Sequence, residues 1–254
     1  MNLAFYLIVF LYAHLAYGEP LGDALIAEGH PYLYDRQYNL NPIPIHPRSL
    51  GPSSFCKKLK DNNRFEEEIQ VYLHQDKIMP PQKGQALFIG GSVISEWKSL
   101  KTQMSPCKVL SRAFGGATTE DLLTRMDQII LPYRPKIIVY YAGSNDLSLG
   151  KSPDVIYENF KAFSDKIRKR LPKTHVVFLS IHKAPVTPLL SDPIDAANKK
   201  IELFCKDTPN LVYLEVNDLL SNAEPSFYRE DKLHLTEAGY EEMGKKIKSL
   251  ISTY

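Results

Sequence analysis

The sequence predicts an α/β protein built on a parallel β-sheet, with helices packed against both faces of the sheet. Short apolar runs alternate with longer segments of helical periodicity between residues 86 and 251. The apolar runs are nearly unbroken, which is typical of strands buried on both faces. A strand followed by a helix recurs five times in this region. This order favours parallel strands joined by right-handed crossovers.

The first predicted strand, residues 86–89 (ALFI), leads through two glycines to Ser92. The spacing of Val93, Trp97 and Leu100 indicates a helix that begins at the serine, and we interpret Trp97 as a core residue. A serine in this turn lies at the carboxyl edge of the sheet, where open α/β sheets bind ligands. The N-terminus of a helix also favours developing negative charge. Ser92 is therefore a candidate nucleophile.

The remaining elements follow from the same periodicities. An amphipathic segment at 64–75 predicts a helix before the first strand, and two prolines in the following KIMPPQKG stretch end it. Thr118 or Thr119 can cap the helix after the second strand, and Pro153 opens a long helix reaching about residue 171. Further strands are expected at 109–110, 136–141, 175–181 and 211–216, and further helices at 193–206 and 236–251.

Composition and charge suit a globular domain and argue against nucleic acid as a partner. The chain has 254 residues, of which 44% are hydrophobic and 24% charged, as in ordinary folded proteins. The formal net charge is +2, and basic residues such as Lys245 and Lys246 lie beside Glu241 and Glu242. A nucleic-acid-binding surface needs a basic patch or stripe, which this interspersed pattern does not provide.

Residues 1–18 are predicted to be a secretory signal peptide, which implies a secreted, extracellular protein. Residues 3–16 are almost wholly apolar, and a small-x-small site ends at Gly18. The run is shorter than the roughly 20 apolar residues that span a bilayer. We expect no membrane association after cleavage. No Lys or Arg precedes the run, and an uncleaved anchor is the alternative.

Residues 19–60 are predicted to be an N-terminal extension, and residues 61–254 the folded domain. The extension is rich in Tyr, Pro, His and Asn and has no clear periodicity. Two interpretations are open: the extension binds an extracellular matrix partner, or it is a linker packed on the domain.

Three cysteines fit an oxidising compartment with one disulfide and one remaining thiol. We expect Cys56 to pair with Cys107, because both flank polar loop segments. Cys205 lies on a helical pattern and is expected to be buried as a small hydrophobic residue.

Three polar motifs follow later strands, at the same predicted sheet edge as Ser92. They are GG at 115–116, GSND at 143–146 and DKLH at 231–234. Each alone also fits a turn or helix cap. Together they supply what acyl transfer needs: Ser92 as nucleophile, His234 as its general base and Asp231 to orient the imidazole. The backbone N–H groups of Ser92 and Gly116 and the Asn145 amide would form an oxyanion hole.

In this order and spacing the motifs resemble those of the SGNH (GDSL-type) serine hydrolases. The matching blocks are FIGGS…W at 88–97, SRAFGG at 111–116, GSNDL at 143–147 and DKLHL…GY at 231–240. The resemblance covers about residues 64–251. It implies a flavodoxin-like three-layer α/β/α sandwich with five parallel strands, ester hydrolysis, and no metal or cofactor. Substrates of the family include acetylated sugars, lipids, aryl esters and thioesters.

The sequence departs from the family pattern at four positions. Gly91 stands where the name motif has Asp, although that position is not part of the triad. Ser111 and Ala113 replace a common Asn and Gly, and Lys232 replaces a frequent Gly between the acid and the base. None of the expected catalytic side chains is missing.

We therefore expect a secreted serine esterase for small-molecule, carbohydrate or lipid esters. A small acyl group is favoured because no long apolar lid is evident. The alternative is a non-catalytic extracellular matrix or binding protein that retains the fold, as Gly91 and the extension at 19–60 allow. The retained set of Ser92, Asp231 and His234 favours the enzyme.

Overall fold

The structure, a computed structural model, describes residues 64–220 and 227–254. Arg64–Tyr254 form one compact unit. The predicted signal peptide (1–18), the extension (19–60) and Cys56 lie outside the described residues. No helix in the described part of the chain is long and apolar enough to cross a membrane.

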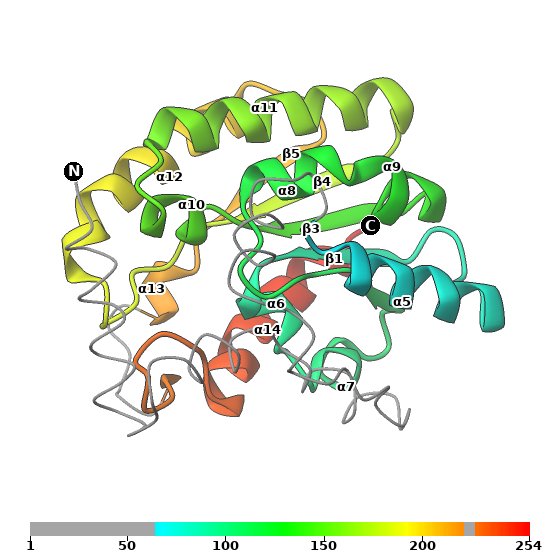
Figure 1. The fold of residues 1–254 in the computed structure, drawn as a ribbon, viewed down its shortest axis with the longest axis horizontal. Coiled ribbons are helices and arrows are strands. Elements are labelled where there is room, and N and C mark those ends of the chain that lie inside the picture. The colour runs from blue at the N-terminus through cyan, green and yellow to red at the C-terminus, as the bar shows by residue number, and fades with distance from the viewer. Residues whose placement is uncertain (1–63, 221–226) are drawn as a thin grey trace, which may run out of the picture. The chain divides into compact units, whose positions relative to one another are not determined.

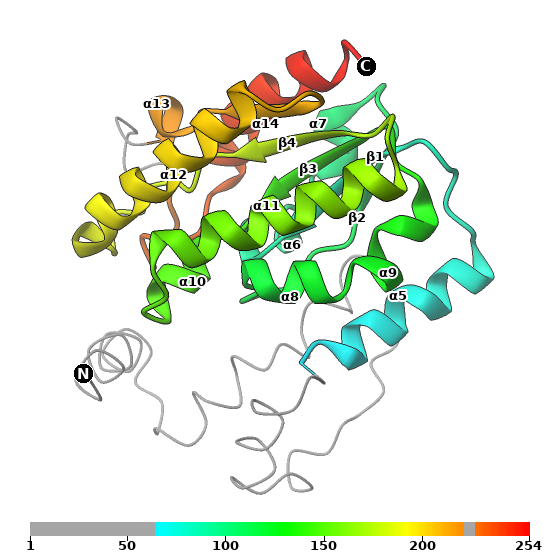
Figure 2. The same cartoon turned by 90° about the horizontal axis from the view of Figure 1, so that it is seen from above.

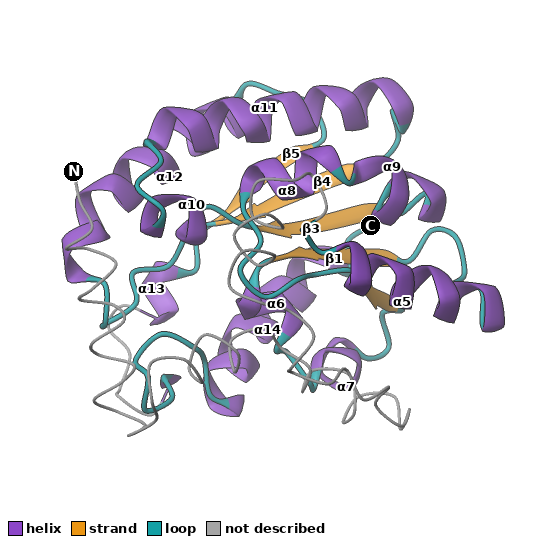
Figure 3. Cartoon of the chain, viewed as in Figure 1, coloured by secondary structure: helices purple, strands orange, loops and turns teal. Residues whose placement is uncertain are grey.

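The sheet confirms the predicted fold class. Five parallel strands are ordered β2-β1-β3-β4-β5, which is the flavodoxin-like order, and helices flank them (Figures 1 and 3). Phe88 of β1 lies between Ser111 of β2 and Val139 of β3. The strands are β1 Ala86–Gly90, β2 Val109–Ser111, β3 Ile137–Tyr141, β4 His175–Leu179 and β5 Leu211–Leu214.

Helices cover both faces of the sheet, as the unbroken apolar strands predict. Side chains of β1 alternate between two cores: Leu87 and Ile89 pack in one, and Phe88 packs in the other. The first core lies under α5, α8, α9, α11 and α12, and the second under α6, α7, α13 and α14 (Figure 2). The helices are α5 Glu66–Ile78, α6 Ser92–Ser95, α7 Leu100–Met104, α8 Thr119–Thr124, α9 Met126–Ile129, α10 Ser144–Ser148, α11 Pro153–Arg170, α12 Ser191–Lys206, α13 Asn217–Leu220 and α14 Glu237–Ile251.

Two helices that the periodicity predicts as continuous are each divided. The helix after Ser92 ends at Ser95, and α7 starts five residues later, at Leu100. The turn between them directs Trp97 into the second core, where its ring stacks on Tyr240 with centroids 5.1 Å apart. The prediction of Trp97 as a core residue is confirmed, because it is 1% exposed.

The helix after the second strand is divided at Arg125, between α8 and α9. Thr118, not Thr119, is its N-cap. The Thr118 side chain accepts the backbone N–H of Asp121, and the Asp121 carboxylate accepts the N–H of Thr118 in return. This reciprocal capping box satisfies two backbone donors that the helix would otherwise leave unpaired.

Cys205 is buried on α12, as expected, and burial raises the pKa of its thiol to about 12. Cys107 forms no disulfide with another described residue. Because Cys56 lies outside the described residues, its pairing with Cys107 stays a prediction.

Candidate active site

Ser92 is the first residue of α6, directly after the carboxyl end of β1. Gly90 adopts a φ of +153°, and a Cβ at this position would lie 2.1 Å from the carbonyl oxygen of Tyr141 on β3. Gly91 donates its N–H to the same oxygen at 3.2 Å. Only glycine permits so close an approach. This contact fixes the turn that presents Ser92 at the edge of the sheet.

The structure brings Ser92, His234 and Asp231 into one hydrogen-bonded chain. The distance from Ser92 Oγ to His234 Nε2 is 3.0 Å, and that from His234 Nδ1 to Asp231 Oδ2 is 2.8 Å. An ionised carboxylate only accepts hydrogen bonds, so Nδ1 carries the proton and Nε2 is left to accept from the serine hydroxyl. This is the arrangement needed for a serine nucleophile and its general base.

Asp231 is held in its ionised form by local hydrogen bonds. Partial burial by itself would raise the pKa of this carboxyl group. Hydrogen bonds from the His234 ring and from the N–H groups of His234 and Leu233 outweigh burial and lower the pKa below 3.8. Those two N–H groups lie 2.9 and 2.8 Å from Asp231 Oδ1. Lys232, between the acid and the base, adopts a φ of 55°. This is the left-handed region that glycine adopts most easily.

The three predicted oxyanion-hole donors lie on segments that meet beside Ser92. Asn145 Nδ2 donates one hydrogen to the carbonyl of Ala117 at 2.9 Å, which leaves its second hydrogen available. A Cβ on Gly91 would lie 2.9 Å from this Nδ2 and 3.5 Å from the Ala117 oxygen. The N–H groups of Ser92 and Gly116 have no hydrogen-bond acceptor among the described residues.

A buried carboxylate, Asp146, fixes the loops that carry these donors. It has no exposed surface and accepts hydrogen bonds from the N–H and hydroxyl of Thr119 at 2.9 and 2.8 Å. Burial raises the pKa of Asp146 above 3.8, and the two bonds from Thr119 oppose that rise. Asp146 thereby links the start of α10, next to Asn145, to the start of α8. The sequence analysis gave Asp146 no separate role.

Glu96 and Arg229 are two further charged residues at the site that the sequence analysis did not select. Glu96 Oε1 lies 3.6 Å from His234 Nε2, and its Oε2 lies 2.5 Å from Arg229 Nη1. The signal for Glu96 was present in the sequence. Residues four apart share one face of a helical turn, and Glu96 follows Ser92 by four positions.

Another buried histidine, His182, packs against the strand ends near His234. Its Nδ1 shares a hydrogen bond with the Tyr141 hydroxyl at 2.6 Å. Its Nε2 has no hydrogen-bond partner of normal geometry among the described residues. Burial lowers the pKa of His182 to about 4, because a charged imidazolium would lose its hydration there. His182 is therefore neutral over most of the pH range.

Because His182 is buried in its neutral form, we expect acid to destabilise the fold. In the unfolded chain its pKa is 6.5, and in the folded protein about 4, so the unfolded state binds the proton more readily. The stability that this residue contributes is present above pH 6.5 and is lost as the pH falls towards 4, by about 3 kcal/mol. Urea unfolding at pH 7.5 and 4.5 should therefore show a larger pH effect in the wild type than in His182→Gln. Equal pH effects in the two proteins would contradict this account.

Gly91 offers a way to displace Asn145 without straining the backbone. Its φ of −83° suits any residue, but a Cβ would lie 2.9 Å from Asn145 Nδ2. Gly91→Ala should move the amide by a few tenths of an ångström and lower kcat by about tenfold to a hundredfold, because loss of one oxyanion donor costs ~10²–10³. Thermal unfolding should change little. An unchanged kcat on a reactive ester would show that this amide does not stabilise the oxyanion.

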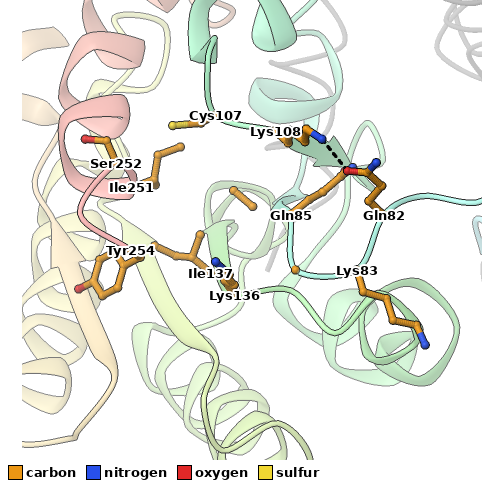
Figure 4. A pocket seen from close by; sticks show the side chains of 12 residues that line it. Gln82, Lys83, Gln85, Cys107, Lys108, Lys136, Ile137, Ile251, Ser252 and Tyr254 are labelled. Atoms are coloured by element: carbon orange, nitrogen blue, oxygen red, sulfur yellow. Dashed lines mark hydrogen bonds between the residues drawn. The ribbon is translucent and has the colours of Figure 1, made fainter.

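A cavity of about 270 Å³ lies at the opposite edge of the sheet (Figure 4). It is formed by segments that precede β1, β2 and β3 and by the end of the chain, and Ser92 and His234 are not among its lining residues. In the described ranges, no group of three or more His, Cys, Asp or Glu side chains is placed to hold a metal ion.

A family model described as GDSL-like lipase/acylhydrolase matches residues 94–242. The matched range includes Gly116, Asn145, Asp231 and His234 and begins two residues after Ser92. No curated protein sequence is significantly similar to the chain.

Solved structures share the fold at low sequence identity. A Streptococcus pneumoniae protein assigned as a platelet activating factor has a TM-score of 0.66 and 19% identity, covering 79% of this chain and 99% of its own. A GDSL-like lipase from Bacteroides thetaiotaomicron has a TM-score of 0.57 and 20% identity, covering 76% and 98%. A mutant of an acetyl-xylooligosaccharide esterase from Geobacillus has a TM-score of 0.53 and 14% identity, covering 65% and 93%.

Proposed function

The chain belongs to the GDSL-like lipase/acylhydrolase family and is a hydrolase, and we propose that it is a secreted serine esterase. Ser92, His234 and Asp231 form its catalytic triad. The single observation that carries this assignment is the continuous hydrogen-bonded chain from Ser92 Oγ through His234 to Asp231, with distances of 3.0 and 2.8 Å.

In the acylation step, Ser92 Oγ attacks the carbonyl carbon of the ester while its proton passes to His234 Nε2. The new C–O bond forms as the carbonyl π bond opens, and the carbonyl oxygen becomes an oxyanion. His234 then gives the proton to the alcohol oxygen as the bond to the leaving alcohol breaks. Asp231 holds the imidazole in the required tautomer and stabilises the imidazolium that forms between these two transfers.

In the deacylation step, a water molecule replaces the alcohol. The oxygen of the water attacks the acyl carbon while His234 takes a proton from the water. His234 then gives this proton to Ser92 Oγ as the acyl–serine bond breaks. The products are a carboxylic acid and the regenerated serine. In both steps the N–H groups of Ser92 and Gly116 and the Asn145 amide stabilise the oxyanion, and these fixed donors need no reorganisation during the reaction.

The preferred substrate is an ester that joins a small acyl group to an alcohol, which is a small molecule, a carbohydrate or a lipid. Two observations support this choice. The sequence has no long apolar segment between the motifs that would make a lid, and the acetyl-xylooligosaccharide esterase among the structural neighbours is named for acetylated substrates. The apolar run of residues 3–16 and the small-x-small site that ends at Gly18 support secretion.

Hydrolysis of p-nitrophenyl acetate and p-nitrophenyl octanoate, by protein purified from the medium of secreting cells, tests this function. We expect the acetate to be hydrolysed with the higher kcat/KM, and the N-terminus of the secreted chain to lie near Glu19. Preference for octanoate would overturn the small-acyl proposal alone. Protein that stays with the cell membrane and retains residues 1–18 would favour the uncleaved anchor.

The second candidate function is a non-catalytic extracellular matrix or binding protein, which would bind its partner through residues 19–60. The Tyr- and Pro-rich composition of that extension supports it. If a folded sample hydrolyses neither ester, nor an acetylated sugar or a thioester, this candidate becomes the favoured one.

A further inference from the structure

The imidazole of His234 lies between two carboxylates. Asp231 contacts Nδ1 at 2.8 Å, and Glu96 Oε1 lies 3.6 Å from Nε2, the nitrogen that faces Ser92 Oγ. A serine triad needs only the first of these carboxylates. The Glu96 side chain is 13% exposed, against 30% for Asp231. Because Glu96 is the less exposed of the two, solvent screens its charge less.

Arg229, which is itself exposed, is the counter-ion of the half-buried Glu96. Its Nη1 lies 2.5 Å from Glu96 Oε2, and its Nε donates to the carbonyl of Leu235 at 3.0 Å. Its backbone N–H also donates to the carbonyl of His234 at 2.8 Å. Arg229 thus binds both the Glu96 carboxylate, at the C-cap of α6, and the backbone that carries the base His234. Glu96, Arg229 and the His234 loop are therefore held as one unit.

Among the groups around His234, Glu96 and Arg229 supply the main charges on the Nε2 side of the ring. Asp231 faces Nδ1, and the buried His182 stays neutral above a pH of about 4 because burial lowers its pKa to about 4. Lys232, two residues before His234 in the chain, is exposed. On the far side of the pair, burial and the Glu96 charge raise the pKa of Tyr240, so its phenol stays neutral.

We propose that Glu96 and Arg229 are positioning residues that together set the proton affinity of His234 Nε2. This proposal rests on the proposed function of Ser92 and His234. During proton transfer from Ser92 Oγ to Nε2, the imidazolium charge develops beside the Glu96 carboxylate, which stabilises it. In the resting enzyme Arg229 balances part of that negative charge.

The two members of the pair have opposite predicted effects on proton binding. Glu96→Gln keeps the size of the side chain and an oxygen that can accept from Arg229, but removes the negative charge. The pH at which His234 becomes protonated should therefore fall below that of the wild type, and kcat should fall by about tenfold. Arg229→Met leaves Glu96 unbalanced and should move the same midpoint upwards. In the double variant the two shifts should largely cancel.

The test is an NMR titration of the His234 ring in the folded, isotopically labelled protein, combined with the pH dependence of kcat/KM. Glu230→Gln is the matched control, because Glu230 is an exposed carboxylate in the same loop, and it should leave both midpoints unchanged. Arg229→Lys keeps the positive charge but loses the hydrogen bond from Arg229 Nε to the Leu235 carbonyl. It therefore separates the effect of the charge from the effect of that contact. Its midpoint should lie closer to wild type than that of Arg229→Met.

Opposite shifts in Glu96→Gln and Arg229→Met, with both proteins folded, are the expected result. Unchanged midpoints, or a shift in the same direction in both, would overturn the proposal. If Glu96→Gln lowers kcat without shifting the midpoint of His234 protonation, Glu96 has only a structural role and the proposal is wrong. The NMR midpoint needs no turnover, so the pair is tested even if the wild type hydrolyses no ester, an outcome that would count against the proposed function alone.

Discussion

Replacing Ser92 by alanine is expected to lower kcat/KM for ester hydrolysis by about 10⁴-fold or more, because the covalent route needs its oxygen. The fold should be unaffected. Ser92 is half-buried in the first turn of α6, and the side-chain hydrogen bond that its Oγ makes is to His234 at 3.0 Å. Initial rates on p-nitrophenyl acetate and thermal unfolding of the two proteins measure both expectations.

Ser95→Ala is the matched control for this substitution. Ser95 ends the same short helix, and its Oγ lies 3.4 Å from the carbonyl of Ser92, away from the proton-transfer chain. We expect wild-type kcat/KM within about twofold. If the Ser92→Ala protein keeps more than about one hundredth of the wild-type rate, another residue supplies the nucleophile, and the assignment of Ser92 is wrong.

Gly90→Ala is expected to have the largest effect on stability, a loss of at least about 4 kcal/mol in the free energy of unfolding. The added Cβ would lie 2.1 Å from the Tyr141 carbonyl oxygen, at a φ of +153° that alanine rarely adopts. The neighbouring atom belongs to the backbone of a central strand, so it cannot move without disturbing the pairing of β1 with β3. Urea unfolding measures this loss of unfolding free energy. A Gly90→Ala protein that does not fold at all would be the extreme case.

Gly150→Ala separates the cost of the clash from the cost of the backbone conformation. Gly150 also has a positive φ, +76°, but a Cβ there would meet nothing within 4 Å. We expect a loss of about 1 kcal/mol, the cost of the left-handed conformation alone. Losses of similar size in the two variants would show that β1 and β3 can separate at this point, and that the turn before Ser92 is not fixed by the contact.

The sheet was predictable from the sequence because its strands are buried on both faces. The segments 86–89 and 137–141 are unbroken apolar runs, and β1 and β3 are buried at every position. Such runs, each followed by an amphipathic segment, leave few arrangements other than a parallel sheet between two helix layers. The strand order required the family resemblance, because apolar periodicity carries no information about which strands are neighbours.

The breaks inside the helices were not predictable from periodicity. Trp97 fits the apolar stripe of a helix starting at Ser92, but in the structure the chain turns after Ser95 so that the indole can stack on Tyr240. The turn is decided by packing against a residue 143 positions later in the chain (240 − 97), which no local pattern records. Tertiary contacts override local propensity in such segments.

The candidate triad could be predicted because its members occur in short motifs that follow strand ends. Arg229 and His182 could not, because they belong to none of those motifs and are placed at the site by contacts between distant segments. Glu96 lies within the block at 88–97, four residues after Ser92, but its contacts with His234 and Arg229 join distant segments. Gly91 shows the same limit. The sequence marked it as a departure from the family pattern, but only the structure places the Asn145 amide where a side chain on residue 91 would lie.

Covalent labelling by a fluorophosphonate can show whether Ser92 is an activated nucleophile, because the reaction needs no knowledge of the natural substrate. Such reagents phosphonylate serine oxygens activated by a neighbouring base. We expect one adduct, located on Ser92 by tandem mass spectrometry, absent in Ser92→Ala and formed much more slowly in His234→Ala. An adduct on another residue, or no adduct on folded wild-type protein while a known serine hydrolase in the same tube is labelled, would contradict this expectation.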